Sequence, residues 1–149
     1  NEYCDITIVD DLSADEVKTR LANALTKDIE IKKVYEPDIK IGKVASAKYE
    51  IYFDDLNPSV EEIKTALLNP PSISKTTKSG NVKQLDIKSL IYDFDVDMAD
   101  GKKTIYLSLA ASGENYLNPE LVLQSLGQAG LEISDEYEIT RTHILFGEK

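Results

Sequence analysis

Residues 3–9, near the start of the chain, alternate apolar with polar side chains, so that every second side chain falls on the same face, and this pattern predicts a half-buried strand. Residues 29–36 predict a second strand. Between them, Ser13 and Glu16 have the S-x-x-E spacing of a capping box, and apolar residues recur at helical spacing after it. The sequence therefore predicts a strand, a helix and a second strand, in this order.

The same strand–turn–helix pattern occurs a second time in nearly the same letters. The first copy, at 6–21, is ITIVDDLSADEVKTRL, and the second copy, at 49–67, is YEIYFDDLNPSVEEIKTAL. A looser third copy runs from Thr104 to Leu121. Repetition of one supersecondary unit indicates how the chain is built, and it carries little information about chemistry.

Cap signals place two later helices. In the second copy, Asn57 is the expected N-cap, because Pro58 then takes the first helical position, where its missing N–H costs nothing. Asn118 and Pro119 begin another helix in the same way. The alternation over 137–146 predicts a closing strand.

A hairpin around Asp100-Gly101 determines its own register. This dipeptide is a preferred type I′ pair for a two-residue loop. Such a loop places apolar residues on one face and polar residues on the other, as an amphipathic hairpin requires. The expected apolar pairs are Val96 with Ile105, Phe94 with Leu107 and Tyr92 with Leu109, and the expected polar pairs are Asp97 with Thr104, Asp95 with Tyr106 and Asp93 with Ser108.

The element order predicts an α+β protein with ferredoxin-like βαβ repeats. Residues 3–78 read βαββαβ, and residues 46–146 read the same way if 82–97 is an inserted hairpin. The sequence does not choose between these two sub-repeats. Both predict an antiparallel or mixed sheet with helices on one face, and we expect residues 1–149 to form a single α+β domain.

Composition and charge narrow the classes of function. The chain has 149 residues, a net charge of −10 and one cysteine, so no intrachain disulfide can form. No apolar run has the length of a membrane span, and the negative charge disfavours a membrane surface or a phosphate backbone. We expect a cytoplasmic protein.

The aspartates at 93, 95 and 97 resemble the start of a calcium loop. The pattern fails at its sixth position, Met98, where the turn needs glycine, and at its twelfth, Thr104, where a bidentate glutamate is needed. A solvated strand face is the favoured interpretation, and a weak cation site is the alternative.

Other chemistry-bearing residues have structural interpretations. Asp10-Asp11 and Asp54-Asp55 precede helices, where carboxylates complement the helix dipole. His143 is the only histidine and is expected to be structural, on a strand face shared with Arg141. Cys4 is expected to be a buried, inert thiol.

One basic cluster stands out in this acidic chain. Residues 73–78 and 82–87 flank Ser79-Gly80-Asn81, which is a hairpin turn signal. Lysines on such a ribbon either contact phosphate or protect an edge from aggregation, and the second interpretation is favoured. The lysines of this candidate nucleic-acid contact are Lys75, Lys78, Lys83 and Lys88.

Two charged residues occupy apolar stretches. Arg141 lies on a largely apolar strand face, and Asp86 stands between Leu85 and Ile87. A buried charge needs a partner. We hypothesise that Asp86 and Arg141 form a structural ion pair or belong to one site.

Four segments carry a family resemblance: AKYEIYF, VKQLDIKSLI, the LNPELVL run and ITRTHILF, in this order. Together they resemble the uncharacterised bacterial radical SAM-linked protein family, encoded beside or fused to radical SAM enzymes. The resemblance places Asp86, Glu120 and Arg141 in family segments, and Asn118 stands where a basic residue is expected. It also implies that an N-terminal segment of the family, rich in histidine, glycine and basic residues, is missing here.

The resemblance implies an accessory or binding module that works with a radical SAM enzyme, with an RNA or ribosome-related substrate. The chain lacks the cysteines that hold an iron–sulfur cluster, and we expect no cofactor, metal or catalytic residues of its own. The alternative is direct RNA binding or modification through the hairpin of Lys75–Lys88. A third interpretation is an enzyme whose site needs the missing segment.

Overall fold

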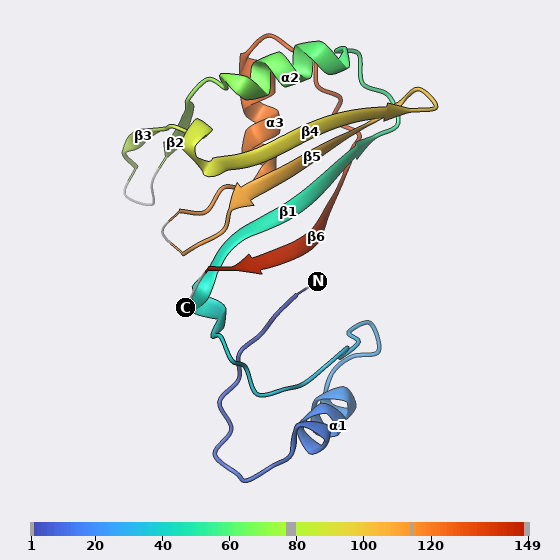
Figure 1. Ribbon diagram of the computed structural model, residues 1–149, viewed down its shortest axis with the longest axis vertical. Coiled ribbons are helices and arrows are strands. Elements are labelled where there is room, and N and C mark those ends of the chain that lie inside the picture. The colour runs from blue at the N-terminus through green and yellow to red at the C-terminus, as the bar shows by residue number, and fades with distance from the viewer. Residues whose placement is uncertain (1, 77–79, 114, 148–149) are drawn as a thin grey trace. The chain divides into compact units, whose positions relative to one another are not determined.

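A computed structural model describes residues 2–76, 80–113 and 115–147, without the side chain of Lys75 (Figure 1). Lys78 lies outside the described residues. The chain forms two compact units, residues 2–41 and the residues from Gly42 onward.

The first unit contains one helix, α1, at Ala14–Ala24. The predicted capping box is confirmed, because Ser13 Oγ accepts from the backbone N–H of Glu16, and the Glu16 carboxylate accepts from the backbone N–H of Ser13. Val17 is the buried residue of this helix.

The strands predicted at 3–9 and 29–36 are not formed, since the described residues 2–41 contain no strand. Alternation marks a segment that can pair, but a strand exists only when a neighbouring backbone supplies its hydrogen bonds. Ile6 and Ile8 are accordingly 50% and 45% exposed. The reading of 3–78 as a βαββαβ sub-repeat, and with it the ferredoxin-like repeats, is not confirmed.

The second unit has an α+β architecture (Figure 1). Four strands form an antiparallel sheet in the order β4-β5-β1-β6, and two further strands form a separate hairpin. The main strands are β1 (Val44–Phe53), β4 (Ile91–Ala99), β5 (Lys102–Ala110) and β6 (Glu138–Phe146), and the hairpin strands are β2 (Ile73–Thr76) and β3 (Val82–Leu85). The helices are α2 (Val60–Leu68) and α3 (Pro119–Gln128), with a short 3-10 helix η2 (Lys88–Leu90). Another 3-10 helix, η1 (Ile41–Lys43), begins at the last residue of the first unit.

Without the β2–β3 hairpin, the elements of this unit follow the order β-α-β-β-α-β. The sequence predicts an inserted hairpin at 82–97, but the insertion is β2–β3, and β4 belongs to the main sheet. The insertion is fixed at its base, because Ile73 and Ile87 are fully buried and Ser125 Oγ of α3 donates to the Pro71 carbonyl at 3.0 Å.

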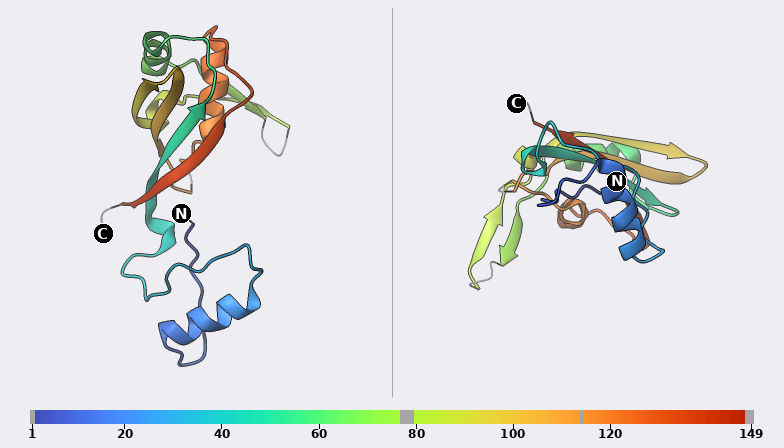
Figure 2. Two further views of the ribbon diagram at one scale, coloured as in Figure 1. Left: turned by 90° about the vertical axis from the view of Figure 1, so that its right-hand side faces the viewer. Right: turned by 90° about the horizontal axis from the view of Figure 1, so that it is seen from below.

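Helices α2 and α3 cover the same face of the main sheet (Figures 1 and 2). Alternate residues of the central strands, such as Ile51 and Ile105, point into this core and are fully buried. The opposite face carries no helix in the described part of the unit (Figure 2). We call this second face the open face.

The β4–β5 hairpin has the predicted register over most of its length, with Asp95 opposite Tyr106. Asp100 and Gly101 both have positive φ, at 52° and 79°, as a type I′ turn requires. The pairing of Tyr92 with Leu109 is wrong. Ile91 takes this place, because a β-bulge leaves Tyr92 unpaired and 57% exposed.

The N-cap of α2 is Ser59 rather than Asn57, and Ser59 forms a capping box with Glu62. The two residues are linked by N–H···O bonds in both directions. The hydrogen bonds from the Ser59 hydroxyl and backbone lower the pKa of Glu62 from its ordinary value of 4.5. This carboxylate therefore stabilises the folded state above pH 4.5, and its contribution is lost as the pH falls through the lowered pKa.

Replacing Ser59 with alanine should lower the free energy of unfolding of the second unit by about 1 kcal/mol at neutral pH. The loss should shrink as the pH falls below 4.5 through the lowered pKa of Glu62, because a protonated carboxyl accepts the capping hydrogen bonds less well. Urea denaturation at several pH values measures both effects. The Glu61→Gln variant is the control, because it removes a charge from the same helical turn and leaves the capping box intact. A Ser59→Ala loss that stays constant with pH would contradict this account.

Candidate functional site

The open face is formed by side chains that alternate with the core residues along four strands. Lys48, Glu50 and Tyr52 of β1 face Ser108, Tyr106 and Thr104 of β5. On the far side of β5, the aspartates 93, 95 and 97 of β4 complete the face. Tyr106 remains 38% exposed at its centre. The face is therefore mainly polar and acidic, with aromatic rings on its two central strands.

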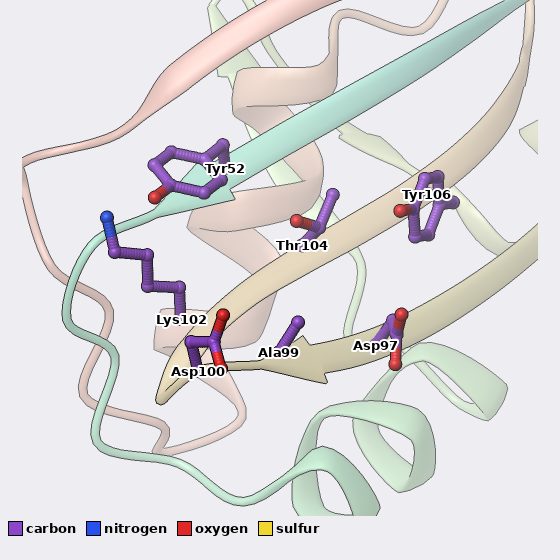
Figure 3. Close-up of a pocket in the computed structure, with 7 residues that line it drawn as sticks. All are labelled: Tyr52, Asp97, Ala99, Asp100, Lys102, Thr104 and Tyr106. Carbon is purple, nitrogen blue, oxygen red and sulfur yellow. The ribbon is translucent and has the colours of Figure 1, made fainter.

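A hollow of about 330 Å³ lies at the hairpin end of the open face (Figure 3). Thr104 forms its floor, and because Thr104 is the partner of Tyr52, the rings of Tyr52 and Tyr106 stand diagonally across the two strands. We call this depression the hairpin hollow. The lining residues are Tyr52, Asp97, Ala99, Asp100, Lys102, Thr104 and Tyr106.

One wall of the hairpin hollow is held by three interacting side chains. Lys102 Nζ lies 2.9 Å from Asp54 Oδ1 and 5.5 Å from the centre of the Tyr52 ring, and the Tyr52 hydroxyl donates to Asp54 at 3.2 Å. Hydrogen bonds from Lys102 and Tyr52 lower the pKa of Asp54, and hydrogen bonds to Tyr52 and Asp54 raise the pKa of Lys102. This wall thus combines a ring, a cation and a carboxylate.

The opposite wall has a ring and carboxylates. Tyr106 of β5 lies opposite Glu50 of β1 on one side and opposite Asp95 of β4 on the other. Figure 3 shows Asp97, also on β4, beside Tyr106. Asp95 is paired with Lys64 of α2 at 2.8 Å, which lowers the pKa of Asp95. This wall favours a positively charged ligand.

The three aspartates of β4 bond to their own strand. Each carboxylate accepts from the backbone N–H of the next residue, at 2.8–2.9 Å. Because β4 is an edge strand, these bonds occupy donors that would otherwise be open to another strand. The side chains are exposed, and no group of metal-binding residues occurs among the described residues. The prediction of a solvated strand face fits this placement.

The acidic pairs before the helices make no cap in the described structure. Ser13 and Ser59 cap the two helices instead, and Asp54 is engaged by Lys102. The dipole interpretation of Asp54-Asp55 therefore misses the main interaction of Asp54. The prediction of a buried Cys4 is also wrong, because the thiol is exposed in a segment without a ladder partner.

Arg141 and His143 lie on opposite faces of β6, so the shared face predicted for them is wrong. The strand has a bulge at Thr142: Arg141 is opposite the buried Tyr49, whereas His143 is opposite the exposed Lys48. Burial and then Tyr116 raise the pKa of Tyr49, and the hydrogen bond with Arg141 opposes this shift. The guanidinium therefore has a partner on the core side of the sheet.

The hypothesis that Asp86 pairs with Arg141 remains a prediction. The Asp86 carboxylate accepts from the backbone N–H of Lys88 at 3.1 Å, just before β4. β4 and β6, which carries Arg141, are the two opposite edges of the sheet. The strand order therefore counts against a direct contact.

The candidate nucleic-acid contact lies partly on the β2–β3 hairpin. Positions 75 and 83 are direct cross-strand partners, and Lys83 is exposed. Lys88 follows the hairpin, and its ammonium donates to the Asn69 side chain at 2.7 Å. The described part of the structure thus pairs the backbones of positions 75 and 83 and places Lys88 at the base of the hairpin.

The residues of the hairpin hollow are not identified as a site by the sequence, although a signal is present. The predicted register already puts Asp95 opposite Tyr106 on the polar face of the hairpin. The position of β1 beside β5 is not contained in that register, and this neighbour brings Tyr52 into the same hollow.

No helix among the described residues has the length and apolar character needed to cross a membrane.

Comparisons with known proteins identify a family. No curated protein matches the chain, and no solved structure matches it. Residues 1–119 match the family described as "Uncharacterized protein conserved in bacteria (DUF2344)", and the chain belongs to this family.

Proposed function

We propose that this protein is an accessory binding module that works with a radical SAM enzyme and recognises a partner through the open face. The observation that carries the proposal is the hairpin hollow, with two tyrosine rings and several carboxylates on a sheet face that no described helix covers. The resemblance to the radical SAM-linked family supports the identity of the enzyme.

The arrangement of side chains supports binding rather than catalysis by this chain. Asp54 and Asp95 are each neutralised by a lysine, and the single histidine lies opposite Lys48, outside the hairpin hollow. No histidine, cysteine or serine is among the residues that line the hollow, and these side chains are common general bases and nucleophiles in catalysis. The hollow instead offers rings, charges and a hydroxyl for contact.

We also propose that residues 44–146 form one ferredoxin-like unit with an inserted hairpin. The order β4-β5-β1-β6 places the strands of two β-α-β halves alternately in one sheet, and this interleaving supports the assignment. A fold of this kind hosts many functions, so the functional argument rests on the hollow.

The proposal is tested by affinity capture of the full natural protein, with and without nuclease, followed by mass spectrometry. A radical SAM enzyme should be enriched over a tag-only control and should remain after nuclease treatment. If no radical SAM enzyme is enriched in either preparation, the accessory role is wrong.

A second candidate function is direct RNA binding through the β2–β3 hairpin. Positions 75 and 83, both lysines in the sequence, are direct partners in the backbone ladder of this hairpin, and a basic ribbon of this kind can contact phosphate. The acidic net charge of −10 opposes the same partner.

If the hairpin binds RNA, the double variant Lys75→Glu/Lys83→Glu should weaken binding at least about tenfold. It should also reduce the slope of log K against log salt by about one for each phosphate that the variant no longer neutralises. Filter binding over a range of salt concentrations measures both quantities. Lys48→Glu on the open face changes the net charge by half as much as the double variant and is the control, which should leave the slope unchanged. Weakening in proportion to the change in net charge, with log K falling half as far in Lys48→Glu, would assign the effect to net charge alone.

A further inference from the structure

We infer that the hairpin hollow binds an arginine side chain of a basic partner segment, seated over Tyr106 and beside Asp97. This inference rests on the proposed binding function and specifies the chemistry of the partner. It follows from a comparison of the two walls of the hollow.

The Tyr52 wall shows which chemistry the hollow accommodates. There a cation from the same chain, Lys102, lies over a tyrosine ring and is held by the Asp54 carboxylate. A ring quadrupole attracts a cation, and an adjacent carboxylate adds a charge-assisted hydrogen bond. Tyr52 and Asp54 thus show, within the same hollow, how a ring and a carboxylate together bind a cation.

The Tyr106 wall repeats the ring and the carboxylate without the cation. Tyr106 is 38% exposed, and Figure 3 shows Asp97 beside it. Among the described residues no lysine or arginine lies over this ring, while Lys64 is occupied by Asp95. The second wall therefore has the same kinds of group as the first, a ring and a carboxylate on neighbouring strands, with its cation to be supplied by a partner.

Charge complementarity gives the class of that partner. Glu50, Asp93 and Asp97 are exposed carboxylates on the open face, where Lys48 is an exposed cation, and the cations Lys102 and Lys64 are already paired. The face therefore repels phosphate and attracts a basic segment. An RNA partner, which carries phosphate, is therefore disfavoured on the open face.

Arginine fits this wall better than lysine does. A guanidinium is planar, so it stacks on a ring while its N–H groups point outward to carboxylates, and it is more weakly hydrated than an ammonium. Glu50 faces Tyr106 from one strand, and Asp97 stands on the other side. These acceptors lie around the ring, where the outward N–H groups of a stacked guanidinium would meet them.

The test uses NMR titration of the isotope-labelled full chain with three five-residue peptides. The peptides have glycine at every position except the centre, which is arginine, lysine or citrulline. Citrulline has the shape of arginine without its charge. The arginine peptide should shift the amides of residues 97–106, the lysine peptide should shift them less, and the citrulline peptide should leave them unchanged. Equal shifts with citrulline would overturn the inference.

Two pairs of matched variants locate the site. Tyr106→Leu and Asp97→Asn should each weaken arginine-peptide binding about fivefold to tenfold. Tyr92→Leu and Asp93→Asn lie on β4 outside the hollow and should leave the affinity unchanged. Equal weakening by Asp93→Asn and Asp97→Asn would show diffuse attraction to an acidic protein and would also overturn the inference.

The inference and the proposed function fail in different ways. If the arginine peptide binds the hollow but no radical SAM enzyme is captured, the enzyme partnership is wrong and the arginine site stands. If capture succeeds equally well with the Tyr106→Leu variant, the partnership stands and the arginine site is wrong.

Discussion

Truncation of Leu107 to alanine should lower the free energy of unfolding of the second unit by about 2–5 kcal/mol. Leu107 is 3% exposed and lies between Tyr49 of β1 and Phe94 of β4 on the core face of the sheet. The substitution removes buried methyl groups and leaves a cavity that the neighbouring strands cannot close.

Replacement of the preceding residue, Tyr106, by alanine is the internal control. Tyr106 points to the open face, so Tyr106→Ala should cost less than about 1 kcal/mol. Urea denaturation followed by circular dichroism measures both values. Equal destabilisation at the two positions would mean that the open face is covered by protein, and that the division of the sheet into a core face and an open face is wrong.

Replacement of all three β4 aspartates by alanine should cause the protein to self-associate at micromolar concentration. The carboxylates of Asp93, Asp95 and Asp97 occupy the backbone N–H groups of the residues that follow them. Their removal leaves a row of donors on an edge strand, which another chain can pair with. The variant also lacks three like charges that keep copies apart.

The triple asparagine variant separates these two causes. Asparagine retains a side-chain oxygen that accepts from the backbone but has no charge, so this variant should associate much less than the alanine variant. Sedimentation velocity over a range of protein concentrations distinguishes them. Equal association of the two variants would assign the effect to charge, and an unchanged alanine variant would show that the edge is protected in another way.

The β4–β5 hairpin shows what local sequence can specify. The Asp100-Gly101 turn determines the register of the residues nearest to it, and these pairs are confirmed as far as Asp93 with Ser108. A bulge then shifts the pairing at Tyr92. A bulge changes the alternation by one residue without any clear composition signal, and for this reason the alternation also misassigns the faces of Arg141 and His143.

The first unit shows the opposite limit. Both copies of the repeated motif form a capped helix, because a capping box depends on residues a few positions apart. Only the second copy has a strand before its helix among the described residues, since β1 finds partners in β5 and β6. Strand formation depends on distant residues, which a local pattern does not contain.

For a similar reason, the hairpin hollow could not be predicted from the sequence. Its two rings come from β1 and β5, which are separated by half of the unit in sequence and adjacent in the sheet. The interaction of Lys102 with Asp54 likewise joins the β4–β5 turn to the loop that follows β1. Sequence alternation identifies the polar face, and the strand order then decides which polar residues meet.

The anchored base of the β2–β3 hairpin has a consequence for how this unit can vary. Ile73, Ile87 and the bond from Ser125 to Pro71 fix both ends of the insertion on the core. The entropy of closing a loop grows only slowly with its length, so lengthening or shortening the segment between these anchors changes the stability of the sheet very little. The hairpin can therefore diverge in length and charge between relatives while the sheet that carries the hollow is preserved.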